Sequence, residues 1–254
     1  MAQAEIGQGR GRPLGSITAE TSRSSHNMAP TINIELSISP LTHCFSRRSA
    51  PTISLKLTLL TDSLSSLDTI TLYTEGTPLH PRHALASAGF TITDLTTQQP
   101  VKLIKWYNAQ RMANPRKRVR GCFEEPFFVT LRAGEAEELT EVFGRPNFRP
   151  HPWSVVKLGH EVDEAGNPLT ARRSVCVTGV DGMEPGHEYE VGINTDGLKK
   201  VMWAPAAKDD ILLEKGSTGP GTNLADYPWI KDQPLEFRVG TTILKVLEEE
   251  EKED

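Results

Sequence analysis

The residues of this chain that could carry out hydrolysis are its histidines, glutamates and cysteines, so their spacing decides which chemistry is open. Zinc-dependent hydrolysis uses two histidines four positions apart with a glutamate between them, because that spacing puts all three on one helix face. His160-Glu161 and His187-Glu188 each supply only the first two residues of this pattern. The sequence therefore predicts no zinc-hydrolase site.

A second arrangement with metal-binding chemistry is His80-Pro81-Arg82-His83, in which two imidazoles stand three positions apart. No cysteine or further histidine lies near it in the sequence, and this pattern is typical of a loop. A metal would be held there only if a distant Asp or Cys folded against the pair. We expect no metal site and no cofactor.

Nucleophilic catalysis and phosphate binding find no better support. His43 and Cys44 are neighbours near the end of an expected strand, where adjacent side chains point to opposite faces and cannot form a dyad. The glycine-rich run 216–221 has no following Lys-Ser/Thr pair and precedes no expected helix. We therefore expect no catalytic residue and predict that the chain is not an enzyme.

A basic cluster is the stronger candidate for a functional site. Five cations lie within ten residues that contain no acid: Arg111, Arg116, Lys117, Arg118 and Arg120. Such a run resembles a short nuclear-import signal, and it suits contacts with phosphates or with an acidic partner. It equally suits a solvated connection between strands, whose charges discourage aggregation at a sheet edge. We take these five residues as candidate contacts for a partner or an import receptor.

The distribution of charge makes any electrostatic argument a local one. The net charge is −5, and residues 248–254 alone carry a net −5, so the remaining chain is formally neutral. This balance gives no general reason to expect nucleic-acid or membrane binding. One hypothesis is that the acidic tail pairs with the basic cluster and masks it. An alternative function, a nuclear DNA-associated protein, depends on this cluster and on Gly9-Arg10-Gly11-Arg12-Pro13, which resembles a minor-groove AT-hook core.

The elements that would position these residues are short strands. Apolar residues alternate with polar ones from Ile32 to Ile38 and from Ile53 to Leu59, the pattern of strands with one buried face. Gly and Pro punctuate the chain between such runs, as in an antiparallel sandwich. Further strands are expected at 70–74, 90–92, 101–104, 127–131, 139–143, 189–193, 198–203 and 235–247. A single helical turn is expected over 82–88.

The resulting organisation is one β-sandwich domain with irregular ends. We expect residues 1–29 to be disordered, 30–205 to form the sandwich with a loop insertion at about 144–173, 206–247 to be a C-terminal extension packing on it, and 248–254 to be an acidic tail. Trp153, Trp203 and Trp229 are expected to close the sandwich or to anchor the extension.

The compartment is predicted from cysteines and apolar runs. Cys44, Cys122 and Cys176 are sparse, odd in number and far apart, which favours a reducing compartment and buried thiols. No apolar run approaches the roughly 18 to 20 residues of a membrane span, and the first residues show no apolar signal-peptide region. We expect a cytoplasmic or nuclear protein.

The order of strands from Leu55 to Ile193 resembles the propeptide domain of fungal deuterolysin-type zinc metalloendopeptidases. The residues that carry the resemblance are 54–59, 69–79, 90–93, Pro100-Val101, 128–135 and 186–191. What the resemblance implies is an immunoglobulin-like sandwich. Unlike the family's pattern, we expect no protease domain to follow the sandwich, and the sequence adds the 144–173 insertion and a segment from about 196 onward.

The sequence therefore predicts an all-β, immunoglobulin-like antiparallel sandwich that acts as a non-enzymatic protein-interaction module. Its recognition surface would combine the Arg111–Arg120 loop with the Gly76-Thr77-Pro78 end of the sheets. The alternatives are a propeptide-like inhibitor or folding assistant of a metalloprotease, and the nuclear DNA-associated protein. We expect a protein partner, no membrane and no nucleic acid; the sequence specifies neither the partner nor the oligomeric state.

Overall fold

The structure is a computed structural model, and it describes residues 29–46, 50–60, 68–103, 115–144, 178–230 and 235–248. Within these ranges the chain is mostly β-structure, as predicted, and forms three sheets. The first sheet has the order β11 (Glu236–Val239), β1 (Thr31–Ser39), β3 (Thr52–Leu60) and β8 (Ala136–Val142). The second has the order β10 (Met202–Ala204), β4 (Thr69–Tyr73) and β7 (Phe128–Arg132). The third has the order β2 (Thr42–Cys44), β12 (Thr242–Leu247), β9 (Glu188–Ile193), β5 (Phe90–Asp94) and β6 (Gln99–Pro100).

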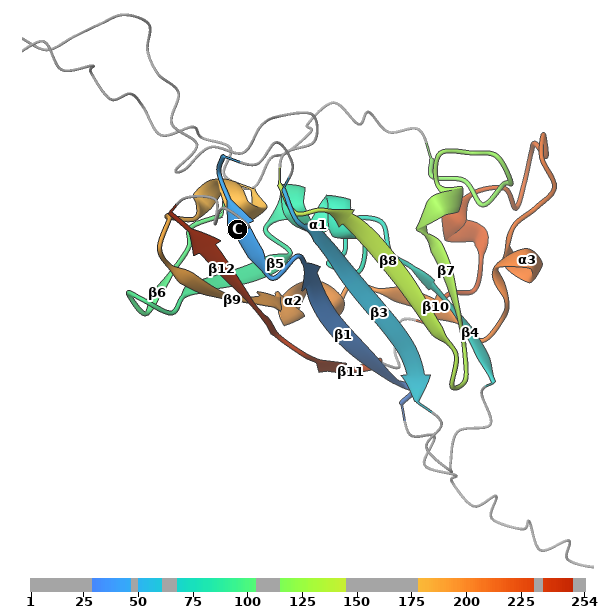
Figure 1. The fold of residues 1–254 in the computed structure, drawn as a ribbon. Helices are drawn as coiled ribbons and strands as arrows, with labels where there is room; N and C mark the ends of the chain where they lie inside the picture. The colour runs from blue at the N-terminus through green and yellow to red at the C-terminus, as the bar shows by residue number, and fades with distance from the viewer. Residues whose placement is uncertain are drawn as a thin grey trace, which may run out of the picture.

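Helices in the described residues are short and lie in the connections. The α-helices are α1 (Pro81–Ser87), α2 (Thr195–Leu198) and α3 (Lys208–Ile211). The 3₁₀ turns are η1 (Glu125–Phe127), η3 (Gly179–Gly182) and η4 (Leu224–Asp226). Figure 1 shows β1, β3 and β8 as one layer, with the sheet of β4, β7 and β10 toward one end of the molecule and β5 and β9 toward the other.

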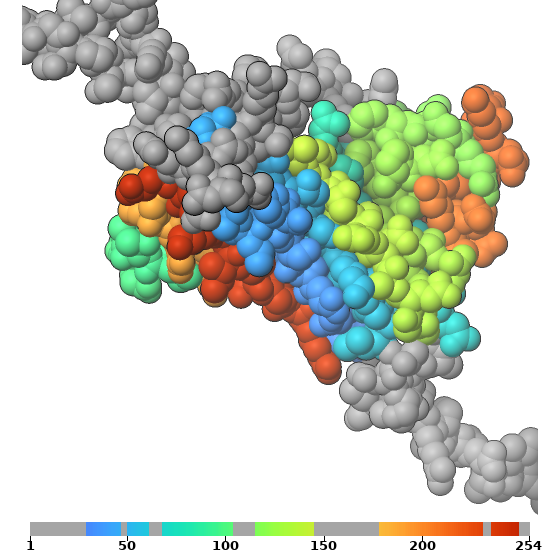
Figure 2. All heavy atoms as spheres, viewed as in Figure 1, coloured from blue at the N-terminus to red at the C-terminus, as the bar shows by residue number. Residues whose placement is uncertain are grey.

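The antiparallel pair of β1 and β3 is the longest among the described residues. Its register joins Thr31 to Leu60 at one end and Ser39 to Thr52 at the other. Because both strands alternate apolar and polar residues, one shared face is buried: Ile32, Ile34, Leu36, Ile38, Ile53, Leu55, Leu57 and Leu59 are each at most 7% exposed. The opposite face is polar, and Lys56 Nζ lies 3.3 Å from Glu35 Oε2 there. Figure 2 shows this outer face, with β11, β1, β3 and β8 side by side on the surface.

Two apolar clusters hold the elements together. The larger one receives side chains from all three sheets, including Leu57 of β3, Leu72 of β4, Val191 of β9 and Val246 of β12. The smaller one lies under residues 202–230 and packs Tyr73 and Phe128 against Ile211 and Trp229. The C-terminal segment is therefore attached by its own core. Trp203 and Trp229 are 2% and 7% exposed, in agreement with their predicted anchoring role, whereas Trp153 lies outside the described residues.

Several predicted elements are confirmed, including the strands at 32–38, 53–59, 90–92 and 189–193, and the turn of helix at α1. Two predictions are wrong in detail. Only the end of the segment 198–203 forms the expected strand, since just Met202–Ala204 pairs with β4. Leu198 belongs instead to α2, which Asn194 caps by accepting from the Asp196 N–H. The strand expected at 101–104 lies earlier in the chain, as β6 at Gln99–Pro100. The Val101 N–H still donates to Ile92 O, and Ile104 lies outside the described residues.

The C-terminal residues pack on the sheets through residues 206–230, and strands form within 235–247, as predicted. The expected strand is two strands, β11 and β12, which belong to different sheets. Both make parallel pairs, β11 with β1 and β12 with β2, although the prediction was antiparallel. These partners are far apart in sequence, so no hairpin fixes their direction. The predicted disorder of residues 1–29, the 144–173 insertion and the acidic tail fall almost entirely outside the described residues.

No helix in the described part of the chain is long and apolar enough to cross a membrane.

The buried face of β3 gives a direct test of the fold. Leu57→Ala should lower the free energy of unfolding by about 2–5 kcal/mol, because it leaves a cavity in the core that joins the sheets. Lys56→Ala, one residue away on the outer face, should cost no more than about 1 kcal/mol, because its ion pair is solvent-exposed. Urea denaturation of both variants measures the difference. Equal losses would contradict the assignment of the two faces.

Candidate interaction surface

The predicted basic cluster is joined to the C-terminal segment by strand-like backbone hydrogen bonds. Arg118 N–H donates to Thr222 O at 2.9 Å, and Leu213 N–H donates to Arg118 O at 2.9 Å. On either side, Leu224 N–H donates to Arg116 O and Arg120 N–H donates to Leu213 O. Residues 116–120 therefore lie between the 211–214 and 221–224 segments. The cluster forms part of a folded unit, and Arg111 lies outside the described residues.

Arg118 is a structural residue within this connection. Its Nε donates to Gly221 O at 2.8 Å and its Nη1 donates to Ile211 O at 2.6 Å. The guanidinium carbon also lies 5.3 Å from the centre of the Tyr227 ring, within the range of a cation–π contact. Because these interactions use the planar donor set of arginine, Arg118 links two separate C-terminal loops. Its charge is directed into the fold.

Arg116 pairs with a nearly buried carboxylate at the end of β4. Arg116 Nε lies 2.6 Å from Glu75 Oε2, and the Glu75 side chain is only 4% exposed. The same oxygen accepts from Tyr73 Oη at 2.6 Å. Burial, together with the hydrogen bond to Glu75 and its charge, raises the pKa of Tyr73, so this phenol stays protonated as the donor. This pairing also places the basic cluster beside the predicted Gly76-Thr77-Pro78 end, so the two predicted parts of the surface do meet.

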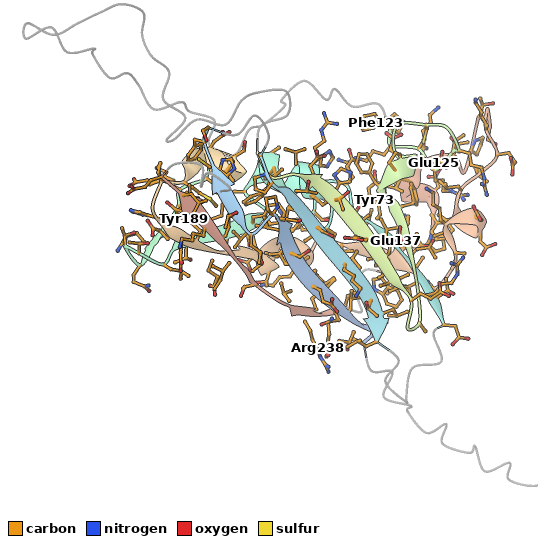
Figure 3. The ribbon with its side chains drawn as sticks, viewed as in Figure 1. Tyr73, Phe123, Glu125, Glu137, Tyr189 and Arg238 are labelled. Carbon is orange, nitrogen blue, oxygen red and sulfur yellow. The ribbon has the colours of Figure 1, made fainter. Side chains whose placement is uncertain are left out.

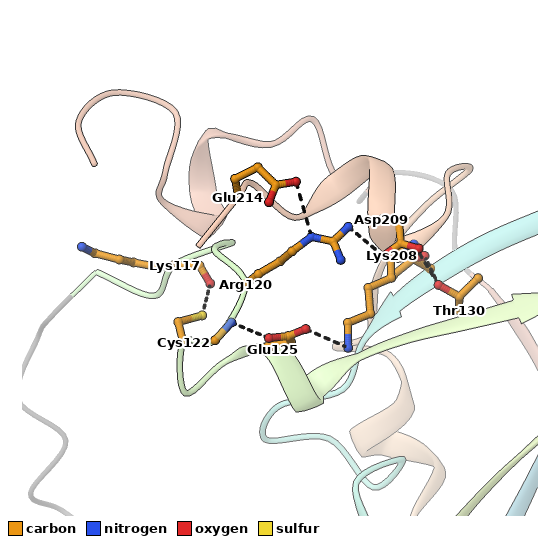
Figure 4. Close-up of polar contacts among 10 residues, drawn as sticks. Lys117, Arg120, Cys122, Glu125, Thr130, Lys208, Asp209 and Glu214 are labelled. Carbon is orange, nitrogen blue, oxygen red and sulfur yellow. Dashed lines mark hydrogen bonds and ion pairs between the residues drawn. The ribbon is translucent and has the colours of Figure 1, made fainter. Parts of the chain in front are cut away.

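Arg120 belongs to an ion-pair network with residues near α3 (Figure 4). Its Nη2 lies 2.8 Å from Asp209 Oδ1, and its Nε lies 4.0 Å from Glu214 Oε1. Nearby, Lys208 Nζ lies 3.8 Å from Glu125 Oε1, and Glu125 also accepts from the Gly121 N–H (Figure 4). These contacts fix the turn from Arg120 to Glu125.

Lys117 differs from the three arginines. Its backbone bridges to Asn223, but its exposed side chain has no hydrogen bond or ion pair with any residue that the structure describes. Its carbonyl accepts from Cys122 Sγ at 3.6 Å, which brings the turn back against it. Arg116 is exposed as well, but its guanidinium is paired with Glu75, so Lys117 is the exposed cation of the described cluster whose charge is not used within the described residues.

An aromatic side chain stands on the same turn. Phe123 is 61% exposed, and its ring centre lies 5.5 Å from that of buried Phe127. Phe127 in turn contacts His83 at 5.0 Å and His80 at 4.9 Å. Figure 3 shows Phe123 and Glu125 together at one end of the molecule, near Tyr73. The rings form a continuous row from the surface to the interior.

The loop after β4 contributes less surface than predicted. Gly76 is exposed at φ 70°, a left-handed conformation that favours glycine, and its N–H donates to His83 Nδ1 at 3.1 Å. Thr77 and Pro78 are buried: Thr77 Oγ1 donates to Thr74 O, and Pro78 packs against Gly197. Of the predicted contact residues at this end, only Gly76 is available to a partner.

The two histidines of the 80–83 motif pack against each other with ring centres 4.5 Å apart. Burial lowers the pKa of His80 to about 4, and the nearby charges of His83 and Arg82 act in the same direction. Among the described residues, no group of three or more His, Cys, Asp or Glu side chains could hold a metal ion. In this structure the motif serves packing and closure of the loop.

The cysteines are only partly as predicted. Cys44 is 1% exposed in β2, as expected for a buried thiol, and the neighbouring His43 is equally buried. Cys122 is half-buried in the turn beside Lys117, although a buried thiol was expected. Cys176, His160 and the AT-hook-like residues lie outside the described residues, so the predictions about them stay predictions.

Sequence reasoning did not identify the C-terminal partner of the basic cluster. Asp209 and Glu214 supply acids that the cluster itself lacks, which was the available signal. The backbone pairing and the carbonyls that Arg118 contacts carry no such signal, because every residue has a carbonyl. Comparison with protein-family models, with curated proteins and with solved structures gives no match for this chain.

Removing the guanidinium of Arg118 should destabilise the protein. Arg118→Ala should lower the free energy of unfolding by about 1–3 kcal/mol, because it leaves Gly221 O and Ile211 O without their charged donor. Lys117→Ala, its neighbour with an exposed side chain, should change stability by no more than about 0.5 kcal/mol. Urea unfolding curves compare the two variants. A similar small change in both would contradict the structural role of Arg118.

His80 should make stability depend on pH. Its folded-state pKa of about 4 is below its ordinary value near 6.5, so its contribution is complete above pH 6.5 and is lost as the pH falls toward 4. His80→Gln should therefore lose less stability than the unmodified protein between pH 7 and pH 4.5.

Asp94 contributes in a separate window. Burial opposes its ionisation, but hydrogen bonds from His187 and from the Thr96 and Thr97 N–H groups outweigh burial and lower its pKa. Its contribution is present above its ordinary pKa near 3.9 and is lost at lower pH. Thermal unfolding between pH 7 and 4.5 therefore avoids most of the Asp94 contribution, and identical pH profiles for the His80→Gln variant and the unmodified protein would refute the role of His80.

Proposed function

We propose that this chain is a non-enzymatic β-sandwich module that binds another protein through Lys117, Phe123 and the exposed Arg82 of α1. The observation that carries the proposal is the exposure of Phe123 on a turn that is fixed by several polar contacts. Aromatic residues dominate the energetics of protein interfaces, and a rigid turn loses little conformational entropy when it binds. Lys117 belongs to the same turn, because its carbonyl accepts from Cys122 Sγ, and Arg82 lies between His80 and His83, whose rings contact Phe127. Both cations are exposed.

The proposed surface is smaller than the one predicted from sequence. The three arginines have mainly structural roles, because each guanidinium contacts a partner within the chain; they are Arg116, Arg118 and Arg120. Thr77 and Pro78 are buried and would not touch a partner. Contact would therefore centre on the turn itself, and the arginines would contribute by holding it in place.

The same pairings weigh against the DNA-associated alternative. Binding to nucleic acid gains most of its affinity when free Lys and Arg side chains displace counterions from phosphates. Glu75 and Asp209 already neutralise two of the described cations of the cluster, and Arg118 is committed to carbonyls. A protein partner is better suited to a surface with one exposed ring and few unpaired charges.

Two further features belong to this proposal. The arrangement of the three sheets is taken as an immunoglobulin-like sandwich, supported by the shared core of β1, β3, β4 and β9. The compartment is taken as cytoplasmic or nuclear, supported by the sparse cysteines of the sequence and by the half-buried thiol of Cys122.

Affinity capture with a double variant tests the function. The full chain and the Lys117→Glu/Phe123→Ser variant are used as baits, and captured proteins are then purified and tested for direct binding. We expect at least one partner whose affinity falls by about tenfold or more in the variant, as for loss of an interface aromatic.

The matched control is Leu41→Ser/Lys245→Glu. Leu41 is 59% exposed, and the Lys245 N–H donates to Leu41 O. This pair therefore matches Phe123 and Lys117 as an exposed apolar residue near a basic one, but it lies at a different sheet. The control should retain the partner. A partner that binds all three proteins equally, or no direct binder, would refute the proposed surface.

A further inference from the structure

A second surface lies at the edge of the first sheet, on β8, and does not involve the turn around Phe123. β8 is hydrogen-bonded to β3 and forms the end of the sheet order. The Phe143 N–H donates to Pro51 O at 2.7 Å, which sets the phase of the antiparallel ladder. Residues 137, 139 and 141 therefore direct their backbone groups toward β3, because hydrogen-bonded pairs alternate along such a ladder.

The alternate residues of β8 direct their backbone groups away from the sheet. These are Ala136, Glu138, Thr140 and Val142, of which Val142 is satisfied locally: its N–H donates to Glu141 Oε1 and its carbonyl accepts from Gly144. The N–H and C=O groups of the other three have no partner among the residues that the structure describes. All three residues are exposed. Such a row of unpaired donors and acceptors is a template for one more strand.

The side chains of β8 are acidic on both faces of the sheet. Glu137 and Glu141 share a face with Leu139, which pairs with Leu55, and Figure 3 shows where Glu137 lies on β8. Glu138 lies on the outer face and accepts from Ser54 Oγ. Within the described residues no Lys or Arg forms an ion pair with any of these three glutamates. Lys56 lies opposite Glu138 in the ladder, but its ammonium group pairs with Glu35. The edge therefore combines open backbone groups with a net negative charge.

The open backbone groups and the negative charge together determine which kind of strand can pair with β8. A second copy of β8 in antiparallel pairing would place glutamates against glutamates, which is unfavourable for cross-strand neighbours. A segment with Lys or Arg would bring opposite charges together on both faces while its backbone completed the ladder. The acidic side chains alone would not define a site; the open backbone of Ala136, Glu138 and Thr140 gives the binding its direction and register.

We propose that the open edge of β8 binds an extended, lysine- or arginine-rich segment of a partner protein by strand addition. The new strand forms backbone hydrogen bonds to Ala136, Glu138 and Thr140, and its cations lie near Glu137, Glu138 and Glu141. Specificity for basic segments comes from the carboxylates, which also discourage pairing between two copies of the chain.

The test uses the full chain and a synthetic ten-residue peptide of alternating lysine and threonine. The matched peptide carries an N-methyl group at every residue, which removes the backbone donors of both edges and keeps the charge. We expect the unmodified peptide to bind at least about tenfold more tightly than the N-methylated one by fluorescence anisotropy, because strand addition depends on backbone hydrogen bonds. Equal affinities would overturn the proposal, since they would mean attraction by charge alone.

Two variants test the position of the site. Glu137→Gln/Glu141→Gln should weaken binding of the basic peptide about tenfold, and glutamine keeps the acceptor for the Val142 N–H. Glu188→Gln/Glu190→Gln changes the charge equally on exposed positions of β9, which already has a strand on each side, and should leave binding within about twofold.

Amide exchange measured by NMR gives an independent readout. Peptide binding should slow exchange of the Ala136, Glu138 and Thr140 amides more than that of other exposed amides. Equal weakening by both double variants, no binding at all, or protection confined to another strand edge would each overturn the proposal. A dimer of the unmodified protein that protects the same three amides without peptide would identify a second copy as the occupant and would also overturn it.

Discussion

The fold depends on the burial of one face of the antiparallel pair β1–β3. These two strands alternate so strictly that their apolar side chains form a continuous sheet face, and side chains of the other two sheets pack in the same cluster. A shift of this pair by one residue would turn every apolar side chain to the solvent, so the register is strongly specified. β11 and β8 then extend the sheet on its two sides. The acidic edge belongs to β8 because β8 ends this sheet order.

A second constraint organises the other end of the molecule. The basic connection at 116–120 crosses residues 206–230 through backbone hydrogen bonds, and Trp229 closes the small core beneath by packing near Tyr73 and Phe128. The Trp229 Nε1–H donates to Leu224 O, so its polar group is satisfied inside that core. The hydrogen bonds of the arginines and the packing of the small core therefore stabilise the same part of the chain. Together they fix the position of the turn that carries Lys117 and Phe123.

The local elements could be predicted from the sequence because their signals are local. Period-two alternation identified β1, β3, β5 and β9, and the strand expected at 139–143 corresponds to the second half of β8. The signal failed where packing decided the outcome. Leu198 lies in α2 rather than in a strand, since the Asn194 cap and the close contact of Gly197 with Pro78 fix the chain there.

The site was predictable only as a set of residue types. The sequence identified the cations and the loop after β4, and the structure brings them together through Arg116 and Glu75. It could not distinguish Lys117 from the three arginines, because their difference lies in contacts with residues between about forty and one hundred positions away. The pairings of β11 with β1 and of β12 with β2 join segments about two hundred positions apart and leave no pattern within either strand.

The central claim is that the basic connection is part of the fold and holds the exposed turn in place. Hydrogen exchange of the backbone amides of Arg118, Arg120, Leu213 and Leu224 in the full chain tests it most directly, because each of them donates across this connection. The account predicts protection that approaches that of the β3 amides and is lost together with them in denaturant. Exchange of these four amides at the rate of an unstructured peptide, with β3 still protected, would show that the connection is an independent solvated loop and would contradict the account.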